Sequence, residues 1–349
     1  MPDFPWDRLV APKARASEVP GGLVDLSVGT PVDETPPAVR EALAQAANAP
    51  GYPTVHGTPA VRGAAAGWLD RTLDVTADPQ HVLPLIGTKE FVAWLPTLLG
   101  LGPDDVVASP AIAYPTYSVG ALIAGCQTAS VGEPASLVWL NSPSNPTGEV
   151  LTVAQLREVV DAARQTGAIV ASDECYIELG WDTRPVSVLH PQVCGGDHTG
   201  LLAVHSLSKR SNLAGYRFGF TVGDPALVKR LLEVRKHAGM MVPLPVQAAA
   251  TVALGDDEHV VVQRNRYASR RDELSKALTG AGFRIDGSQA GLYLWATRDE
   301  PCWDSVQWLA DRGILVAPGD FYGAGGARHV RVALTATDEA VALAARRLG

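Results

Sequence analysis

Short apolar runs alternate with helical patterns along the middle of the chain. Six runs of strand length, bounded by turn residues, are predicted to be buried strands: residues 81–87, 105–110, 136–143, 167–174, 201–208 and 217–223. Between them, residues 88–100, 116–125 and 152–167 show helical spacing, and Thr152 is the expected N-cap of the last helix. This alternation predicts an α/β fold with a mostly parallel sheet between helices. Ligands of such folds bind beyond the carboxyl ends of the strands.

The pattern changes after about residue 255. A long helical stretch over 257–282 is followed by short elements at 283–287, 291–297, 304–313, 314–319, 329–335 and 338–349. We therefore predict a large domain over 46–255 and a smaller α+β domain built from 1–45 and 256–349. The first 45 residues are rich in Pro and Gly and are expected to form an arm.

The composition and charge of the chain favour a function that involves small-molecule ligands. The 349 residues are 46% hydrophobic, with a net charge of −8 and scattered basic residues, which argues against nucleic-acid binding. No run has the length of a membrane span, and the start has no signal-peptide pattern. The four cysteines lack metal-ligand spacing. We expect a cytoplasmic protein with reduced thiols, no membrane or nucleic-acid partner and no metal.

Four polar clusters follow the predicted strands, where a ligand would bind. They are the turn Gly87, Thr88 and Lys89; the stretch NSPSNPTG at 141–148; SDECY at 172–176; and SLSK at 206–209 with Arg217 beyond it. Together they offer an amine, a carboxylate, a phenol, an amide and an anion site. Pyridoxal 5′-phosphate needs this set: a lysine for covalent attachment, a carboxylate for the ring nitrogen, donors for the ring oxygen and an anion site for the phosphate.

The motifs SNPTG, SDECY and SLSK…GYRFG, in that order, resemble the class I/II aminotransferases, which have the fold-type I architecture of pyridoxal-phosphate enzymes. The likeness extends from Leu26 to Arg331. It implies that Lys209 binds the cofactor covalently and moves the Cα proton. It also implies a homodimer in which Tyr52 reaches the phosphate of the other subunit. The further cofactor contacts that it implies are Asp173 at the ring nitrogen; Asn145 and Tyr176 at the ring oxygen; Tyr114 stacked on the ring; and Gly87, Thr88, Lys89, Ser206, Ser208 and Arg217 around the phosphate.

For the substrate, the resemblance implies that Arg331 grips the α-carboxylate, with Gly29 and Asn145 beside it. Each role has a plainer alternative in the residues alone. Arg331 could face outward from an edge strand, Tyr114 and Tyr117 could be core aromatics, and Tyr52 could be an ordinary loop residue. Two departures from the family pattern stand out: Ser142 occupies a position where the family more often has proline, and the stretch 126–137 is short.

The opening segment, the GTKE turn and the compact length resemble the actinobacterial N-succinyldiaminopimelate aminotransferases of lysine biosynthesis. This implies ping-pong transfer of an amino group from glutamate to N-succinyl-2-amino-6-oxopimelate, with 2-oxoglutarate as product. The extra carboxylates of these substrates need a second cation, for which Arg235, Lys236 and Lys13 are candidates.

The sequence is also compatible with other functions that use the same fold. Within the family they are the LL-diaminopimelate, aspartate, aromatic and alanine aminotransferases. A pyridoxal-phosphate C–S lyase would instead release ammonia and pyruvate without a keto acid. A transcriptional regulator with an aminotransferase-like domain would need a DNA-binding domain ahead of Leu26, for which the preceding segment is expected to be too short.

Overall fold

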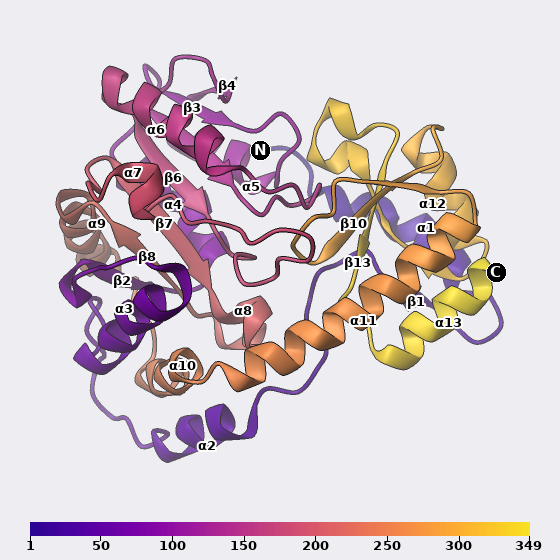
Figure 1. Ribbon diagram of the computed structural model, residues 1–349, viewed down its shortest axis with the longest axis horizontal. Coiled ribbons are helices and arrows are strands. Elements are labelled where there is room, and N and C mark those ends of the chain that lie inside the picture. Colours follow the sequence, from indigo (N-terminus) through magenta and orange to yellow (C-terminus); the bar gives the residue numbers. More distant parts are fainter.

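A seven-stranded sheet forms the centre of the structure, a computed structural model that describes residues 1–349 (Figure 1). Its strand order is β2-β8-β7-β6-β5-β3-β4. The strands are β2 (Val82–Leu85), β3 (Val106–Ser109), β4 (Gln127–Ser130), β5 (Leu137–Asn141), β6 (Ile169–Asp173), β7 (Leu201–Ser206) and β8 (Gly219–Gly223). Each of the six predicted runs is a strand of this sheet. The edge strand β4 was missed because it is mostly exposed and lacks an apolar run.

Only β8 departs from the parallel arrangement, since it runs antiparallel to both β2 and β7. Gly219, the first residue of β8, pairs with Leu85 at the end of β2 and with Ser206 at the end of β7. The segment that enters β8 therefore lies at the sheet edge where the other strands end. This reversal brings Arg217 to the same edge as the other polar clusters.

Helices cover both faces of the sheet because successive strand residues point to opposite sides. On β5, Val138 and Leu140 belong to a core of 33 buried residues with side chains of α3, α6 and α10, whereas Leu137 and Trp139 belong to a core of 18 with α4, α5 and α9. The predicted cap of α6 is confirmed: the Thr152 side chain accepts a hydrogen bond from the backbone N–H of Gln155, in a capping box. The helices of this part are α2 (Pro37–Gln45), α3 (Pro59–Leu73), α4 (Thr88–Leu98), α5 (Thr116–Ala124), α6 (Val153–Thr166), α7 (Pro191–Cys194), α8 (Leu207–Arg210), α9 (Pro225–Ala238) and α10 (Leu244–Gly255), with 3-10 turns at η2 (Pro79–His81) and η3 (Ala214–Tyr216).

The remaining elements surround a third core of 30 buried residues. An antiparallel sheet of order β12-β13-β10-β9 and a parallel pair, β1 with β11, form its strands. The elements are η1 (Pro5–Leu9), α1 (Val10–Ser17), β1 (Val24–Asp25), α11 (Glu258–Gly280), β9 (Arg284–Asp286), β10 (Tyr293–Thr297), α12 (Cys302–Ala310), β11 (Ile314–Leu315), β12 (Ala317–Pro318), η4 (Gly319–Tyr322), η5 (Ala324–Gly326), β13 (Val330–Ala333) and α13 (Asp338–Leu348). Much of the expected N-terminal arm is thus ordered structure. Leu9, Val24 and Leu26 are buried in this core, and the Pro and Gly content obscured the short elements around them.

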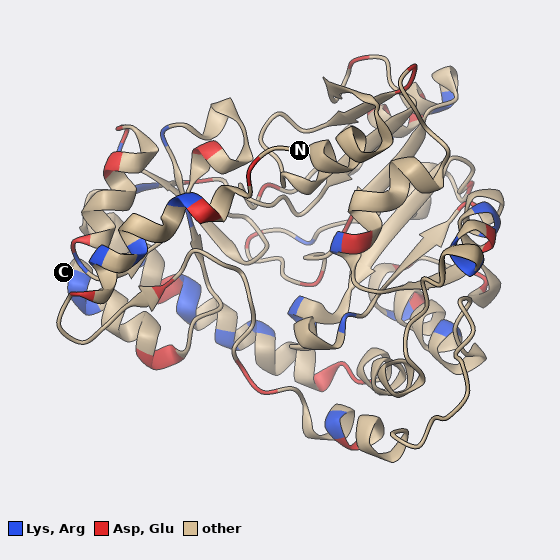
Figure 2. Ribbon diagram, turned by 180° about the vertical axis from the view of Figure 1, so that it is seen from behind, with Lys and Arg blue, Asp and Glu red and all other residues tan.

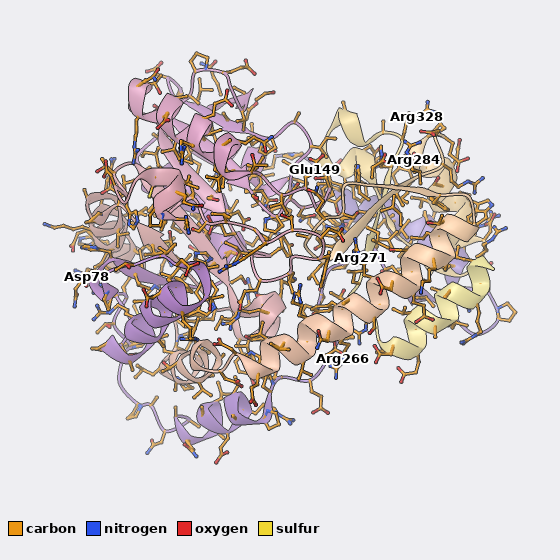
Figure 3. All side chains as sticks on the ribbon, in the orientation of Figure 1. Asp78, Glu149, Arg266, Arg271, Arg284 and Arg328 are labelled. Atoms are coloured by element: carbon orange, nitrogen blue, oxygen red, sulfur yellow. The ribbon has the colours of Figure 1, made fainter.

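The long helix α11 runs from α10 to the smaller sheet and binds neighbouring segments through its arginines (Figure 3). Arg266 pairs with Asp33 at 3.2 Å and Arg271 pairs with Asp182 at 2.9 Å. Basic and acidic residues are interspersed over the molecule (Figure 2). None of the helices combines the length and apolar character needed to cross a membrane.

Candidate active site

A cavity of about 700 Å³ opens at the edge where the strands of the large sheet end. Its wall contains most of the residues singled out from the sequence: Gly29, Thr88, Lys89, Tyr114, Asn145, Asp173, Tyr176, Ser206, Ser208, Lys209, Arg217 and Arg331. Gly87 lies just behind this wall. Tyr52 lies outside the cavity and is 97% exposed.

Lys209 extends from α8, the short helix that follows β7, into the cavity. Its ammonium group donates a hydrogen bond to the carbonyl oxygen of Gly29 and makes no ion pair. Burial lowers the pKa of Lys209, and the cation Arg217 acts in the same direction. The amine is therefore closer to its neutral, nucleophilic form than an exposed lysine would be.

Asp173 ends β6 and is buried without a cationic partner. Its Oδ2 accepts a hydrogen bond from the phenol of Tyr117 at 2.8 Å, and its Oδ1 accepts one from the backbone N–H of Cys175 at 3.3 Å. Burial raises the pKa of Asp173, and these two donors act against that rise. Tyr117 is both a core aromatic, stacked on Trp139, and the support of this carboxylate.

An anion site lies between the start of α4 and the segment before β8. Gly87 precedes α4 with φ of +78° and provides no side-chain cap, so the first N–H groups of the helix stay free. The positive φ favours glycine here, and a Cβ at Gly87 would lie 2.3 Å from Nη2 of Arg217, so a side chain would displace that guanidinium from its present position. Arg217 makes no ion pair; its Nη1 donates to the carbonyl oxygen of Ala214 at 2.7 Å.

Arg331 forms the opposite wall. It lies on β13, which is paired on both sides by β12 and β10, so the alternative of an outward-facing edge position is wrong. Its Nη1 donates to Oδ1 of Asn145 at 2.9 Å and its Nη2 to the carbonyl oxygen of Ser27 at 2.8 Å, while Nε has no partner. A buried guanidinium without a carboxylate is costly unless an anion joins it.

The charged side chains of the cavity wall that have no partner of opposite charge indicate which ligand the cavity can bind. The cations Lys89, Lys209, Arg217 and Arg331 lack a counter-anion, and the carboxylate of Asp173 lacks a counter-cation. Pyridoxal 5′-phosphate complements this set, since it brings an aldehyde for Lys209, a phosphate for Arg217 and a basic ring nitrogen for Asp173. Arg331 is left for a carboxylate of the substrate.

Several residues of the wall were not found from the sequence. Tyr293 lies in an apolar strand pattern and gave no signal other than that of a core aromatic. Phe4 and Trp6 lie in the segment expected to be an arm, and their rings stack 5.5 Å apart. The Nζ of Lys89 lies 5.5 Å from the ring centroid of Phe4.

The three cations suggested for the distal carboxylate of the substrate do not line the cavity. Arg235 is fully buried and pairs with Glu90 at 3.1 Å, and Lys236 pairs with Glu233 at 2.7 Å. Lys13 lies on α1, away from the wall. Helical spacing and charge alone did not show where these side chains point.

Comparison with known proteins places this architecture in one family. Residues 22–348 match the family "aminotransferase class I and II". The chain is 61% identical over its whole length to 4-dedimethylamino-4-oxo-anhydrotetracycline transaminase OxyQ of Streptomyces rimosus, covering 99% of that protein. It is 62% identical over its whole length to a probable aminotransferase of Mycobacterium tuberculosis, covering 85% of it.

More distant relatives share the fold. An LL-diaminopimelate aminotransferase of Dehalococcoides mccartyi is 31% identical over 95% of this chain and 91% of its own. The structure of a probable N-succinyldiaminopimelate aminotransferase from Thermus thermophilus superposes with a TM-score of 0.90 at 30% identity, covering 99% of both chains. The chain belongs to the class I and II aminotransferases, enzymes that depend on pyridoxal 5′-phosphate.

Proposed function

We propose that the chain is an N-succinyl-LL-diaminopimelate:2-oxoglutarate aminotransferase, which moves an amino group between glutamate and N-succinyl-2-amino-6-oxopimelate in diaminopimelate and lysine biosynthesis. The observation that carries the choice of substrate is Lys89, an unpaired cation on the cavity wall. The Thermus relative named for this activity and the LL-diaminopimelate relatives support it.

Different residues of the cavity wall have different roles in the proposed reaction. The bound cofactor supplies an electron sink for the pair of electrons left when a proton leaves the substrate Cα. Lys209, which its lowered pKa keeps closer to the neutral amine, would take that proton and deliver it within the same half-reaction to the cofactor carbon that bears the amino group, and the second half-reaction would run these transfers in reverse. Asp173 would keep a proton on the ring nitrogen, and Asn145 and Tyr176 would donate toward the ring oxygen. Thr88, Ser206, Ser208 and Arg217 of the wall, with Gly87 at the start of α4, would hold the phosphate, and Tyr114 would cover the ring.

The two ends of the substrate need different cations. Arg331 and the backbone at Gly29 bind the α-carboxylate, and the fixed guanidinium sets which face of Cα meets Lys209. A succinylated diaminopimelate carries further carboxylates several bonds away. Lys89 is a further cation of the wall that makes no ion pair, and its Nζ lies 5.5 Å from the ring centroid of Phe4 in the N-terminal segment. We therefore assign Lys89 to the distal carboxylate, in place of the phosphate role that the family resemblance implied for it and in place of the three candidates suggested by the sequence.

We propose further that the enzyme works as a homodimer with shared sites. Tyr52 is almost fully exposed and lies outside its own cavity, as expected of a side chain whose target is on another subunit. Its phenol would complete the phosphate site of the partner.

A second acceptor is favoured by a specific observation. OxyQ is named for an oxo-anhydrotetracycline, a fused-ring ketone, and shares 61% identity with this chain. Phe4 and Trp6 add two stacked aromatic faces to the cavity, and such faces bind flat rings well.

A panel of substrates tests both proposals. The purified enzyme is given glutamate, aspartate, alanine, phenylalanine, LL-diaminopimelate or N-succinyl-LL-diaminopimelate with 2-oxoglutarate or oxaloacetate, and an oxo-anhydrotetracycline with glutamate. The highest kcat/KM with the succinylated donor is expected. Good turnover of aspartate with none of the succinylated donor would overturn the substrate choice. Ammonia and pyruvate formed without a keto acid would indicate a lyase instead.

A further inference from the structure

Tyr293 lies where the two halves of the cavity meet. It begins β10, and Trp295 two residues later pairs with Arg331 on β13. Because residues two apart on a strand share a face, Tyr293 is the diagonal neighbour of Arg331 on the cavity side. Its side chain is 4% exposed and lines the cavity.

The ring of Tyr293 supports the guanidinium of Arg331. The Cζ atom of Arg331 lies 3.9 Å from the ring centroid, nearer than it lies to any other aromatic ring around it. The hydrogen bonds to Asn145 and Ser27 hold the edge of the same guanidinium. Ring and hydrogen bonds together fix its plane and leave Nε for a ligand.

The hydroxyl of Tyr293 has a different set of neighbours. It lies 3.3 Å from the hydroxyl of Tyr176. It also lies against Gly29, where an added Cβ would be only 2.1 Å from the phenol oxygen, and Gly29 accepts the hydrogen bond of Lys209. The absence of a side chain at Gly29 is therefore what admits this hydroxyl between Lys209 and Tyr176.

Neighbouring charged groups act differently on the pKa values of the two phenols. Burial raises the pKa of Tyr293, but Arg331, Lys209 and the hydrogen bond with Tyr176 outweigh it and leave the pKa lowered. Burial raises the pKa of Tyr176, and Tyr293 adds to the rise. Either hydroxyl can be the donor across the 3.3 Å contact, and a Tyr293 hydroxyl that accepts would compete for the single proton of Tyr176. The ionisable groups that face Tyr293 are Arg331, Lys209, Tyr176, Cys175, Tyr114 and Tyr322.

We propose that Tyr293 is a positioning residue with two separable parts: its ring holds Arg331 ready for the substrate carboxylate, and its hydroxyl takes a share of the hydrogen bond that Tyr176 otherwise directs to the ring oxygen of the cofactor. The proposal rests on the roles assigned above to Arg331 and Tyr176. It does not depend on which amino acid is the natural donor.

Two variants separate the parts. Tyr293→Phe keeps the ring and removes the hydroxyl, and Tyr293→Leu removes both. Tyr267→Phe, which removes a buried phenol hydroxyl outside the cavity, is the matched control. Two readouts are used: KM and kcat for glutamate, and the pH midpoint of the visible absorption band of the holoenzyme without substrate.

Tyr293→Phe should leave KM for glutamate within about threefold and move the spectral midpoint to lower pH by about half a unit. The reason is that Tyr176 then directs its whole hydrogen bond to the ring oxygen and favours the anionic form of that oxygen. Tyr293→Leu should raise KM by about tenfold or more, as expected for a guanidinium that loses its support.

A midpoint that is unchanged in Tyr293→Phe, or that moves to higher pH, would overturn the role of the hydroxyl. An unchanged KM in a folded Tyr293→Leu enzyme would overturn the role of the ring. If the succinylated substrate is not turned over in the panel above, neither result changes. The probes used here are the KM for glutamate and the absorption spectrum of the enzyme without substrate.

Discussion

The phenol of Tyr117 donates a hydrogen bond to Oδ2 of Asp173 over 2.8 Å, from the side of the carboxylate that faces the interior. The ring of Tyr117 is itself fixed, because it stacks on Trp139 of β5 with centroids 5.1 Å apart. The carboxylate at the end of β6 is thus oriented by a residue of the neighbouring helix α5. Its charge in the buried site depends partly on that one donor.

Tyr117→Phe should weaken cofactor binding by about five- to tenfold, since it removes one hydrogen bond to a buried carboxylate. Asp173→Asn should have a much larger effect, because the amide cannot keep a proton on the ring nitrogen. Titration of the apoenzyme with pyridoxal 5′-phosphate, followed by visible absorbance, measures both. Equal losses in the two variants would contradict the supporting role of Tyr117.

Lys209→Ala should abolish the visible band of the resting enzyme and reduce turnover by at least about 100-fold, the range expected for loss of a positioned acid-base group. Lys276→Ala, which truncates an exposed lysine on α11, is the control and should keep both properties. Full activity of the Lys209 variant would refute the assigned chemistry.

Lys89→Met should raise KM for N-succinyl-LL-diaminopimelate by about tenfold while changing KM for alanine by less than about twofold, as expected when one charge-assisted contact is lost. Lys236→Met is the matched control, because Lys236 pairs with Glu233 outside the cavity. The measurement is steady-state kinetics with the two donors. A uniform rise in KM for both donors would point instead to a role at the phosphate.

Glu174→Gln tests a buried contact behind the cavity, where Oε2 of Glu174 lies 3.6 Å from Nε2 of His205. Burial raises the pKa of Glu174 to about 7 and lowers that of His205 to about 3, so both groups are neutral in the folded protein near pH 6. A carboxyl with a raised folded pKa favours folding below its unfolded pKa and loses that contribution as pH rises through about 7.

The variant should therefore gain stability relative to the parent between pH 5 and pH 8, by up to about 3 kcal/mol. The pKa of His205 is lowered by folding, so its contribution to stability increases with pH between about pH 3 and its unfolded pKa. This contribution is present in both the parent and the variant. Denaturant unfolding at the two pH values measures the difference. A variant with the same relative stability at pH 5 and pH 8 would show that Glu174 does not titrate in this range.

Mixed dimers test the shared site. Lys209→Ala and Tyr52→Ala subunits are each expected to be poorly active alone. If Tyr52 completes the site of the partner, one site in a mixed dimer has both residues intact, and mixing should restore activity toward half that of the parent per dimer. No gain on mixing, in the presence of confirmed hybrids, would place Tyr52 outside the shared site.

Much of the fold was accessible from the sequence because the buried strands are nearly continuous apolar runs ended by turn residues. The six runs found in this way form six of the seven strands of the large sheet. The elements that escaped have weaker patterns. The edge strand β4 is polar, and β1 has only two residues within a segment rich in Pro and Gly.

The site was predictable as far as motifs at strand ends could show it. Asp173 and Lys209 lie at one edge because they follow the parallel strands β6 and β7, and Arg217 joins them because β8 reverses direction, a topological fact that the local pattern does not contain. Tyr293 and Trp6 reach the cavity only through tertiary packing. Arg235 looked available in the sequence, yet burial against Glu90 removes it from the site. The domain limits at residues 45 and 255 and the roles of the site residues stay predictions.

The pairing of β2 with β8 also affects the order in which the protein folds and binds its cofactor. Leu85 and Gly219 are neighbours in the sheet although most of the large domain's sequence lies between them. Contacts of such sequence separation form late, because a long loop must close before they are gained. The anion site needs both strands, since Gly87 follows one and Arg217 precedes the other. During refolding, cofactor binding should therefore follow collapse of the core. Recovery of the visible absorption band of the bound cofactor then reports that β2 and β8 have paired.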